Sequence, residues 1–319
     1  MKEIVAPIAV ELIMAELTPE KMLRKTNKGA NEIYIITHHD SPNVMREVGR
    51  LREITFREAG GGTGKEIDID KYDTQENCYK QLIVWNPDAQ EILGGYRYML
   101  GNELDIDENG DPMVATGRLF HFSDQFKKDY LPYTIELGRS FVQPAYQSSK
   151  AGAKALFALD NLWDGLGALT VDHPEIKYFM GKVTMYTHFN VEARNLILYF
   201  YEKYFSDQDR LVYPKDPMIV EMNREEMGRL FSGESYKENY KTLVAEVRKR
   251  GENIPPLVNA YMNLSPTMRT FGTILNEHFG GVEETGILVT IKDIYDAKVD
   301  RHIETYIRQK DNDNFPEVK

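Results

Sequence analysis

This sequence of 319 residues lacks the features that mark exported and membrane-spanning proteins. Cys78 is its one cysteine, so no disulfide can form within the chain, which fits a reducing compartment. No apolar run approaches the roughly 20 residues that a membrane-spanning helix needs. Pro7, Glu11 and Glu16 interrupt the first stretch, which therefore lacks the apolar core of a secretory signal. We expect a cytoplasmic protein, and peripheral contact with the inner face of the membrane stays open.

Clustered positive charge, metal-ligand clusters and a serine nucleophile motif are also missing. Acidic residues outnumber Lys and Arg by 50 to 39, for a net charge of −11. We expect no nucleic-acid partner, because phosphate binding needs gathered positive charge. His38, His39 and His121 have no partners at metal spacing, so we expect no metal site. The absence of a GxSxG elbow leaves serine-based hydrolysis without support.

Two segments imitate ligand-binding motifs. Residues 60–65 (GGGTGK) invite a phosphate-loop interpretation, but their spacing is wrong and Glu66 stands where Ser or Thr is needed. We interpret this segment as a glycine-rich loop that is mobile enough to act as a lid. Residues 105–110 (DIDENG) match the first half of a calcium loop, whose twelfth position would be Thr116 instead of a bidentate Glu. A polar turn is the favoured interpretation there.

Helical and strand patterns follow one another along the chain. Helices are expected at 8–25, 41–59, 152–169, 191–205 and in a mostly helical stretch through 262; strands are expected at 31–37, 81–85, 92–100, 133–142, 177–186 and 286–291. A hairpin and helical crossovers together predict an α+β fold of three layers: a mixed, strongly twisted sheet with helices on both faces. We expect a helical lead over 1–30, then one domain over 31–319 with a helical insertion at about 206–265.

Four short motifs stand in a fixed order. They are Arg52-x-x-x-Phe56, Asp70-x-Tyr72-Asp73, Tyr96-Arg97 and Glu136-x-Gly138-Arg139. Together they resemble the acyl-transferring branch of the GNAT superfamily, namely the hemolysin-like acyltransferases, which include ornithine-lipid and glycine-lipid N-acyltransferases. A more distant likeness is to the acyl-homoserine-lactone synthases. Residues 253–261 (NIPPLVNAY) add to the resemblance, which covers about residues 45–295.

The resemblance implies a GNAT-like fold and the transfer of a fatty acyl group, 3-hydroxylated in some members, to the amino group of glycine or ornithine in aminolipid synthesis. The implied donor is an acyl-phosphopantetheine thioester on an acyl carrier protein, with acyl-CoA as the alternative and no tightly bound cofactor. Two other functions stay open: acyl-homoserine-lactone-like synthesis, and a non-enzymatic membrane-active protein. The long C-terminal region argues against the first, and the lack of a cationic amphipathic helix argues against the second.

Amide formation from a thioester needs a base for the amine and a donor for the thioester oxygen. Glu136 is our candidate base, with a pKa that burial would raise. In a regular strand Arg139 would face the opposite side, because residues three apart do not share a face. Gly138 permits a β-bulge that brings Glu136 and Arg139, our second catalytic candidate, to one face, so we predict a bulge or break within residues 136–140.

The charged residues of the other motifs are candidates for an acceptor site. Asp70 and Asp73 lie in one turn and suit a cationic amine, or a partner such as Arg97 or Arg52. A buried structural ion-pair network is the competing interpretation. For Arg52 and Phe56, substrate binding and simple packing with a snorkelling Arg are equally good interpretations.

The resemblance also implies a donor site. In the family, the strand that carries the catalytic Glu parts from its neighbour and the thioester enters the gap, so backbone N–H groups near Phe141 and Val142 would hold the carbonyl. The family's pyrophosphate motif is only partly kept: Lys150 replaces its first glycine, while Gly152 remains. This pattern favours the single phosphodiester of an acyl carrier protein, and Lys150 is either its contact or a solvated side chain.

A leaving-thiolate acid is the last expectation that comes from the resemblance. Many GNAT proteins use a tyrosine on the helix that follows the second parted strand, and Tyr201 occupies that helix here. Aromatic residues at this density are more typical of a packed core. Tyr201 is therefore a candidate for the substrate site with a strong structural alternative.

Overall fold

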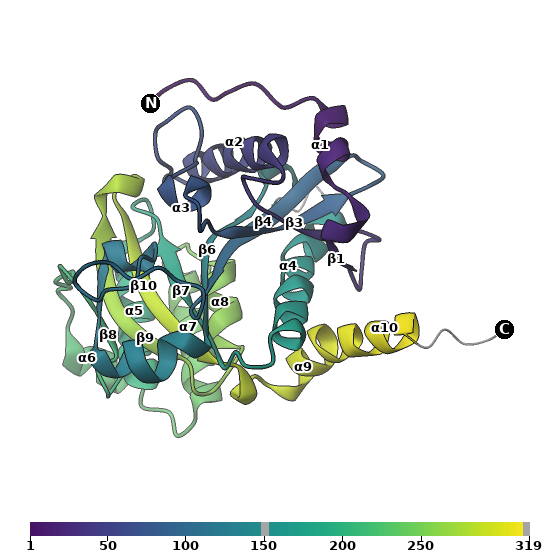
Figure 1. Ribbon diagram of the computed structural model, residues 1–319. Helices are drawn as coiled ribbons and strands as arrows, with labels where there is room; N and C mark the ends of the chain where they lie inside the picture. The colour runs from purple at the N-terminus through teal and green to yellow at the C-terminus, as the bar shows by residue number, and fades with distance from the viewer. Residues whose placement is uncertain (148–152, 315–319) are drawn as a thin grey trace.

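The computed structural model describes residues 1–147 and 153–314, and its centre is one large twisted sheet (Figure 1). Its eight strands, in spatial order, are β1 (Met22–Lys25), β2 (Glu32–Ile36), β3 (Lys80–Asn86), β4 (Glu91–Leu100), β6 (Thr134–Val142), β7 (Tyr178–Met185), β10 (Val282–Thr290) and β9 (Arg269–Asn276). Neighbours are antiparallel except β6 and β7, which are parallel. A small second sheet pairs β5 (Phe120–Phe122) with β8 (Val212–Pro214).

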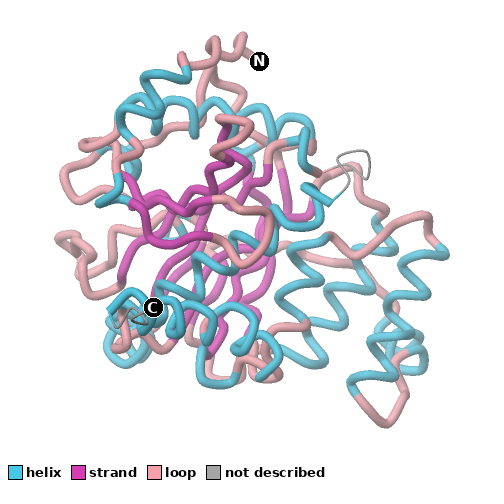
Figure 2. The backbone as a smooth tube through the Cα atoms, turned by 90° about the vertical axis from the view of Figure 1, so that its right-hand side faces the viewer, coloured by secondary structure: helices cyan, strands magenta, loops and turns pink. Residues whose placement is uncertain are grey.

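Helices cover both faces of the large sheet, as the side view in Figure 2 shows. On one face, here called the α2 face, α1 (Val10–Glu16) and α2 (Pro42–Glu58) pack on apolar side chains of β2, β3 and β6. On the other, the α4 face, the packing helices are α4 (Ala153–Asp172), α5 (Val191–Phe205), α7 (Tyr236–Lys249) and α8 (Pro256–Met262). The remaining helices are α3 (Lys71–Thr74), α6 (Arg224–Leu230), α9 (Asp296–His302) and α10 (Glu304–Asn314). The fold expected from the sequence, a mixed sheet between two layers of helices, is confirmed.

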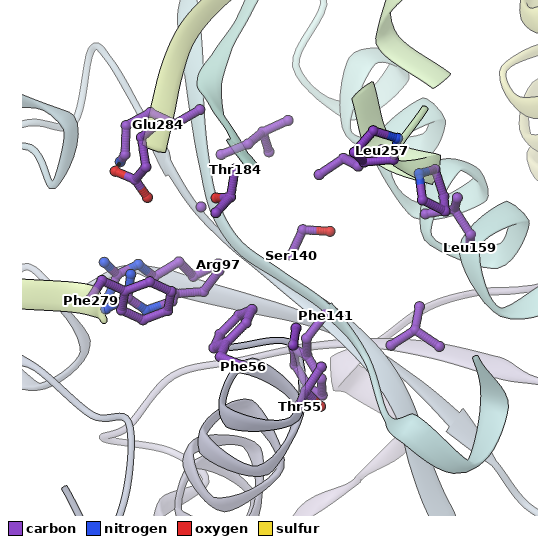
Figure 3. A pocket seen from close by; sticks show the side chains of 18 of the residues that line it. Thr55, Phe56, Arg97, Ser140, Phe141, Leu159, Thr184, Leu257, Phe279 and Glu284 are labelled. Atoms are coloured by element: carbon purple, nitrogen blue, oxygen red, sulfur yellow. Dashed lines mark ion pairs between the residues drawn. The ribbon is translucent and has the colours of Figure 1, made fainter. Parts of the chain in front are cut away.

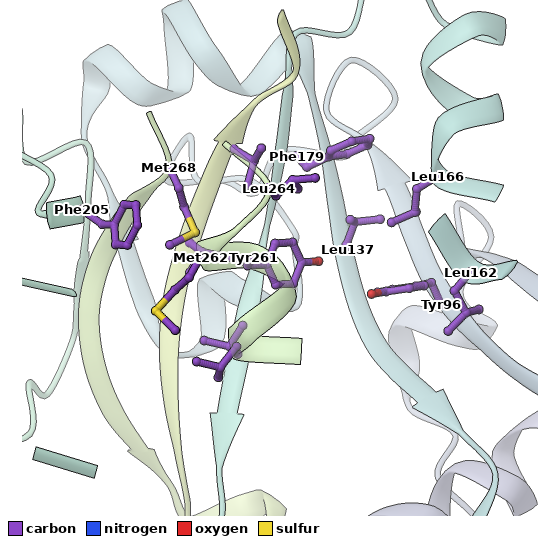
Figure 4. Packing of buried hydrophobic residues seen from close by; sticks show 14 of the residues in the cluster. Tyr96, Leu137, Leu162, Leu166, Phe179, Phe205, Tyr261, Met262, Leu264 and Met268 are labelled. Carbon is purple, nitrogen blue, oxygen red and sulfur yellow. The ribbon is translucent and has the colours of Figure 1, made fainter. Parts of the chain in front are cut away.

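The main core lies under the α4 face. Leu137 of β6 and Phe179 of β7 meet Leu162 and Leu166 of α4 there, and all four side chains are at most 4% exposed (Figure 4). Alternation along β6 explains this arrangement, because Ile135 and Leu137 point to the α4 face while Glu136 between them points to the α2 face. The functional side chains of β6 are thereby directed away from the main core.

Helix α2 begins at Pro42, directly after Ser41, where the sequence predicts its N-cap. The Ser41 side chain does not cap the helix. Instead, Glu16 at the end of α1 accepts hydrogen bonds from the backbone N–H groups of Asn43 (3.1 Å) and Val44 (2.9 Å). A carboxylate stabilises the positive end of a helix dipole, so Glu16 caps α2 and thereby links α1 to α2.

Two segments differ from the expectation. Residues 22–25 were expected to be helical but form β1, which pairs with β2. The helix ends early because Pro19 disfavours a helical conformation at Thr18, whose backbone is extended. The sequence pattern also fails to predict β9, because Gly272, with φ +87°, interrupts its alternation. The segment expected as a helical insertion, about 206–265, holds α6, α7 and α8 together with β8.

Candidate active site

A gap opens between the two parallel strands at the middle of the sheet. β6 and β7 pair only at their first residues, from Thr134 with Tyr178 to Glu136 with Met180, and then part. The gap holds a cavity of about 500 Å³ that reaches from one face of the sheet to the other. In Figure 3, Arg97, Phe279 and Glu284 lie on one side of it, and Leu159 and Leu257 lie on the opposite side. The cavity therefore has a charged end and an apolar end.

A β-bulge lies in β6 at the position predicted from Gly138. Gly95 of β4 pairs with Phe141, and Arg97 pairs with Gly138, so two residues of β6 stand opposite Tyr96 alone. Arg139 is one of them and has φ +50°. Its Nε donates to Asp68 Oδ2 at 2.8 Å on the α2 face. The prediction of a bulge within residues 136–140 is confirmed.

Glu136 lies at the point where the strands part. Its side chain lines the cavity and is almost fully buried, at 2% exposed. The backbone N–H of Thr116 donates to Oε1 at 2.7 Å, and the hydroxyl of Tyr79 donates to Oε2. Burial raises the pKa of Glu136 to about 7, although Lys182 and the Thr116 N–H act in the opposite direction. A carboxyl group with such a pKa exchanges protons readily near neutral pH.

Beside the cavity, six charged side chains form a balanced network of three carboxylates and three guanidinium groups: Asp68, Asp70, Asp73, Arg52, Arg97 and Arg139. Arg97 Nη1 lies 2.9 Å from Asp70 Oδ1 and 3.1 Å from Asp73 Oδ2. Arg52 Nη1 lies 3.2 Å from Asp73 Oδ1. The equal numbers of opposite charges offset the cost of burying them.

The D-x-Y-D motif has a local structural role as well. Asp70 is the N-cap of α3, and its side chain accepts the N–H of Tyr72 at 2.9 Å. Asp73 Oδ2 accepts the N–H of Asp70 at 3.1 Å, which completes a capping box. The motif thus folds its own turn and aims both carboxylates at the arginines of α2 and β4.

The structure divides the expected acceptor residues into two groups. Phe56 and Arg97 line the gap cavity, and Asp70 lines smaller cavities next to it. Arg52 and Asp73 are each 0% exposed and do not line the gap cavity. Their contacts match the structural ion-pair interpretation, in which they hold Arg97 and Asp70 in place.

Phe141 and Val142 both line the cavity, as expected for the donor site. The N–H of Gln143 donates to Leu93 O of β4 at 2.9 Å. Because successive N–H groups of a strand point to opposite edges, the Val142 N–H points into the gap. The Val142 carbonyl also points away from β4, since it accepts a hydrogen bond from Gln147 Nε2. Val142, rather than Phe141, therefore offers the backbone donor.

Two expectations about the leaving group and the phosphate have different outcomes. Tyr201 does not line the gap cavity; it is 3% exposed and packs in the core of the α4 face, near Phe205. These contacts match the packed-core interpretation of Tyr201, because its position on α5 directs it inward, and a role in the substrate site stays a prediction. Lys150 and Gly152 lie outside the described residues.

Three charged or polar residues of the site escaped the sequence analysis. Lys182 of β7 and Glu284 of β10 line the cavity, and their Nζ and Oε2 atoms lie 3.9 Å apart. Lys182 was a usable signal, as a lone cation in an otherwise apolar strand. Tyr79, whose hydroxyl donates to Glu136, gave no such signal, because nothing in the sequence around it separates it from an aromatic residue of the core.

The two segments that resemble ligand-binding motifs, residues 60–65 and 105–110, form structural turns. In the glycine-rich loop, the N–H groups of Thr63 (3.1 Å) and Gly64 (2.8 Å) donate to the buried carboxylate of Glu53, which leaves them unavailable to a phosphate. Asp107 Oδ1 accepts the N–H groups of Asn109 and Asp111, each at 2.9 Å, so this segment is a polar turn. Within 1–147 and 153–314, no group of three potential metal ligands occurs. No helix of the described part is long and apolar enough to cross a membrane.

Comparisons with known proteins bear on this site. Residues 51–156 match the model of the acetyltransferase (GNAT) domain. A "Glycine N(alpha)-acyltransferase" of Phocaeicola vulgatus is 60% identical over 309 residues, 97% of this chain and 95% of that protein. A protein of the same name from Bacteroides thetaiotaomicron is 62% identical over 307 residues, 96% of this chain and 91% of that protein. Among solved structures, a CoA-dependent acyl-homoserine lactone synthase has a TM-score of 0.36 at 12% identity, over 84% of this chain and 88% of that chain.

Proposed function

Because this chain belongs to the family of the glycine N(alpha)-acyltransferases and is an acyltransferase with a GNAT domain, we propose that it transfers a long fatty acyl group, 3-hydroxylated or not, from a thioester to the α-amino group of glycine. The observation that carries the proposal is the parting of β6 and β7 beside a buried carboxyl group whose pKa is about 7. The product would be an N-acylglycine, a lipid or lipid precursor.

The residues at the gap supply the two functions that the reaction needs. The amine nitrogen attacks the thioester carbon, the new carbon–nitrogen bond forms, and the carbon–sulfur bond breaks to release a thiolate. Glu136 takes a proton from the attacking amine, directly or through water, and the thiolate then takes up a proton from the protonated Glu136, again directly or through water. The Val142 N–H donates to the carbonyl oxygen as negative charge develops on it. Arg139 and Asp70 stand beside the acceptor, while Asp73 and Arg52 act as positioning residues.

We assign the two ends of the cavity to the two substrates. The apolar end at Leu159 and Leu257 takes the acyl donor, and the charged end on the α2 face takes the amino acid. An acyl carrier protein is the proposed donor, because residues 147–153 keep only part of the pattern that binds the pyrophosphate of coenzyme A. The long apolar product would enter a bilayer, so peripheral contact with the inner membrane face remains part of the proposal.

A reconstituted reaction tests the acceptor. Purified protein is incubated with 3-hydroxyacyl-acyl carrier protein and glycine, and the products are identified by mass spectrometry. We expect N-acylglycine that depends on both substrates. Ornithine and S-adenosylmethionine, each supplied in place of glycine, are the competing acceptors, and a product from either of these without N-acylglycine would overturn the acceptor assignment.

A second comparison tests the donor. The kcat/KM for an acyl chain on the carrier protein is measured against that for the same chain on coenzyme A. We expect the carrier protein to be the better donor. An equal or higher value for the coenzyme A thioester would contradict the proposed carrier-protein partner and leave the acceptor assignment untouched.

A further inference from the structure

A smaller cavity on the α2 face adjoins the charged end of the gap. Its volume is about 260 Å³, and it shares five lining residues with the gap cavity: Arg97, Ala115, Arg139, Lys182 and Phe279. Arg118, Leu119, Asp70, Asn276 and His278 complete its wall. We call it the cationic chamber, because four of these residues are Lys or Arg and one is acidic. It adjoins the gap cavity that Glu136 lines, which makes it a candidate site for a second substrate.

Most of the chamber's cations already have counter-ions. Arg97 and Arg139 belong to the balanced network with the three aspartates, and Lys182 faces Glu284 at 3.9 Å. For Arg118, by contrast, the described part of the chain offers no ion-pair partner and no side-chain hydrogen bond. Arg118 is exposed, so water hydrates its guanidinium group in the free protein, and among the described residues that line the chamber it is the cation without a protein counter-ion. A single bound carboxylate would complete the balance.

Arg118 is also linked to the candidate base, Glu136, through the backbone of the turn that contains it. It ends a 3-10 turn, Thr116–Arg118, in which Thr116 donates its N–H to Glu136 at 2.7 Å. The preceding residue, Ala115, donates its N–H to the hydroxyl of Tyr79 at 2.9 Å, and Tyr79 in turn binds Glu136. One short turn thus holds the backbone of Arg118 close to the groups that bind Glu136. An α-amino acid likewise presents a carboxylate close to its amine.

From this juxtaposition we propose that Arg118 binds the carboxylate of the acceptor amino acid in the cationic chamber and so directs its amine to Glu136. The inference rests on the proposed function and deepens it by assigning the residue that recognises α-amino acids. Arg118 forms a charge-assisted contact with the carboxylate. The small volume of the chamber and its walls at Leu119 and Phe279 favour an acceptor without a large side chain.

Kinetics with two acceptors test the assignment. Glycine and glycinamide both present an amine, but only glycine presents a carboxylate. For Arg118→Ala we expect the KM for glycine to rise roughly 10- to 100-fold, the value expected from the loss of one charge-assisted hydrogen bond. The KM for the acyl donor and the rate with glycinamide should stay unchanged. Arg229→Ala is the matched control, because Arg229 is 68% exposed and pairs with exposed Glu225 on α6.

The outcomes separate this inference from the proposed function. If the wild-type protein fails to acylate glycine, the proposed function itself is wrong. If it acylates glycine and Arg118→Ala leaves the KM for glycine unchanged, only the carboxylate assignment is wrong. A variant that loses activity on glycine and glycinamide alike would show that Arg118 supports the turn around Glu136, which also overturns the assignment. Arg118→Lys should restore part of the affinity for glycine, because a point charge replaces the fork.

Discussion

Replacement of Glu136 by Gln tests the site through both activity and stability. The change keeps the size of the side chain and removes its charge and basicity. A Gln at this position can still accept the Thr116 N–H through Oε1, and its NH2 group can donate to the Tyr79 oxygen. The fold around the gap should therefore survive. Any loss of activity then reports the missing base.

The expected activity loss follows from the role of a general base, which contributes roughly 10²- to 10⁴-fold to a rate. The wild-type kcat/KM for glycine should rise with pH and level off above about 7, the pKa of Glu136. The rate should fall about tenfold per pH unit on the acid side of this value, because only the ionised carboxylate accepts a proton. Glu136→Gln should retain a low rate without this inflection.

The expected stability change has the opposite sign. Folding raises the pKa of Glu136 from 4.5 to about 7, so the fold favours the protonated carboxyl. This contribution to stability is fully present below pH 4.5 and is lost as the pH rises through 7. The difference amounts to roughly 3 kcal/mol at alkaline pH. Since Gln stays neutral, Glu136→Gln should gain stability over the wild type as the pH rises from 5 to 8.

Two measurements check these expectations together. Initial rates are followed from pH 5.5 to 8.5 with a saturating acyl donor, and urea unfolding is followed over the same range. Glu225→Gln is the control, because Glu225 is 82% exposed. If Glu136→Gln kept more than about a tenth of the wild-type rate at pH 8, Glu136 would not be the base. Parallel pH dependence of unfolding in both proteins would refute the buried, neutralised carboxyl.

Three further substitutions probe the surroundings. Burial alone would raise the pKa of Asp73, but its arginine partners lower this pKa overall, so the stabilising charge of Asp73 is lost as the pH falls. Asp73→Asn should therefore lower the free energy of unfolding at pH 7, measured in urea, by roughly 3–5 kcal/mol, and a loss below about 1 kcal/mol would contradict the network. A Cβ at Gly94 would lie 2.3 Å from Phe141 O, so Gly94→Ala should lower the melting temperature markedly. A Cβ at Gly138 would meet only ordinary contacts beyond 3.4 Å, so Gly138→Ala should change the melting temperature much less, and equal changes would argue against the close approach of β4 and β6. Leu257→Trp should lower kcat/KM for a long acyl donor more than tenfold relative to a short one, and an unchanged ratio would remove the acyl chain from this end of the cavity.

The bulge and the layers of the sheet were predictable because local sequence rules decide them. Gly138 between a glutamate and an arginine left a bulge as the way to bring both to one face, and the strands pair accordingly. Helix α2 follows its apolar periodicity, and strand β4 coincides with a continuous, largely apolar run. β1 and β9 were missed because each depends on a neighbouring strand for pairing more than on its own pattern.

The site was predictable in part. The four motifs pointed to residues that do gather beside the gap, since Glu136, Arg139 and Arg97 line one cavity. Periodicity could not tell whether Tyr201 faces the cavity or the core, because α5 is apolar on most of its surface. Lys182 and Arg118 were missed for a different reason: the cavities that they line are built from distant parts of the chain, and only the folded sheet brings these parts together.

A structure with an unreactive donor analogue would test the central claim most directly. The analogue carries a CH2 group in place of the thioester sulfur and keeps the carbonyl. We expect the pantetheine arm to pass between β6 and β7, with the carbonyl oxygen about 3 Å from the Val142 nitrogen and Glu136 on the α2 side. An analogue bound elsewhere, with the β6–β7 gap left to solvent, would contradict it.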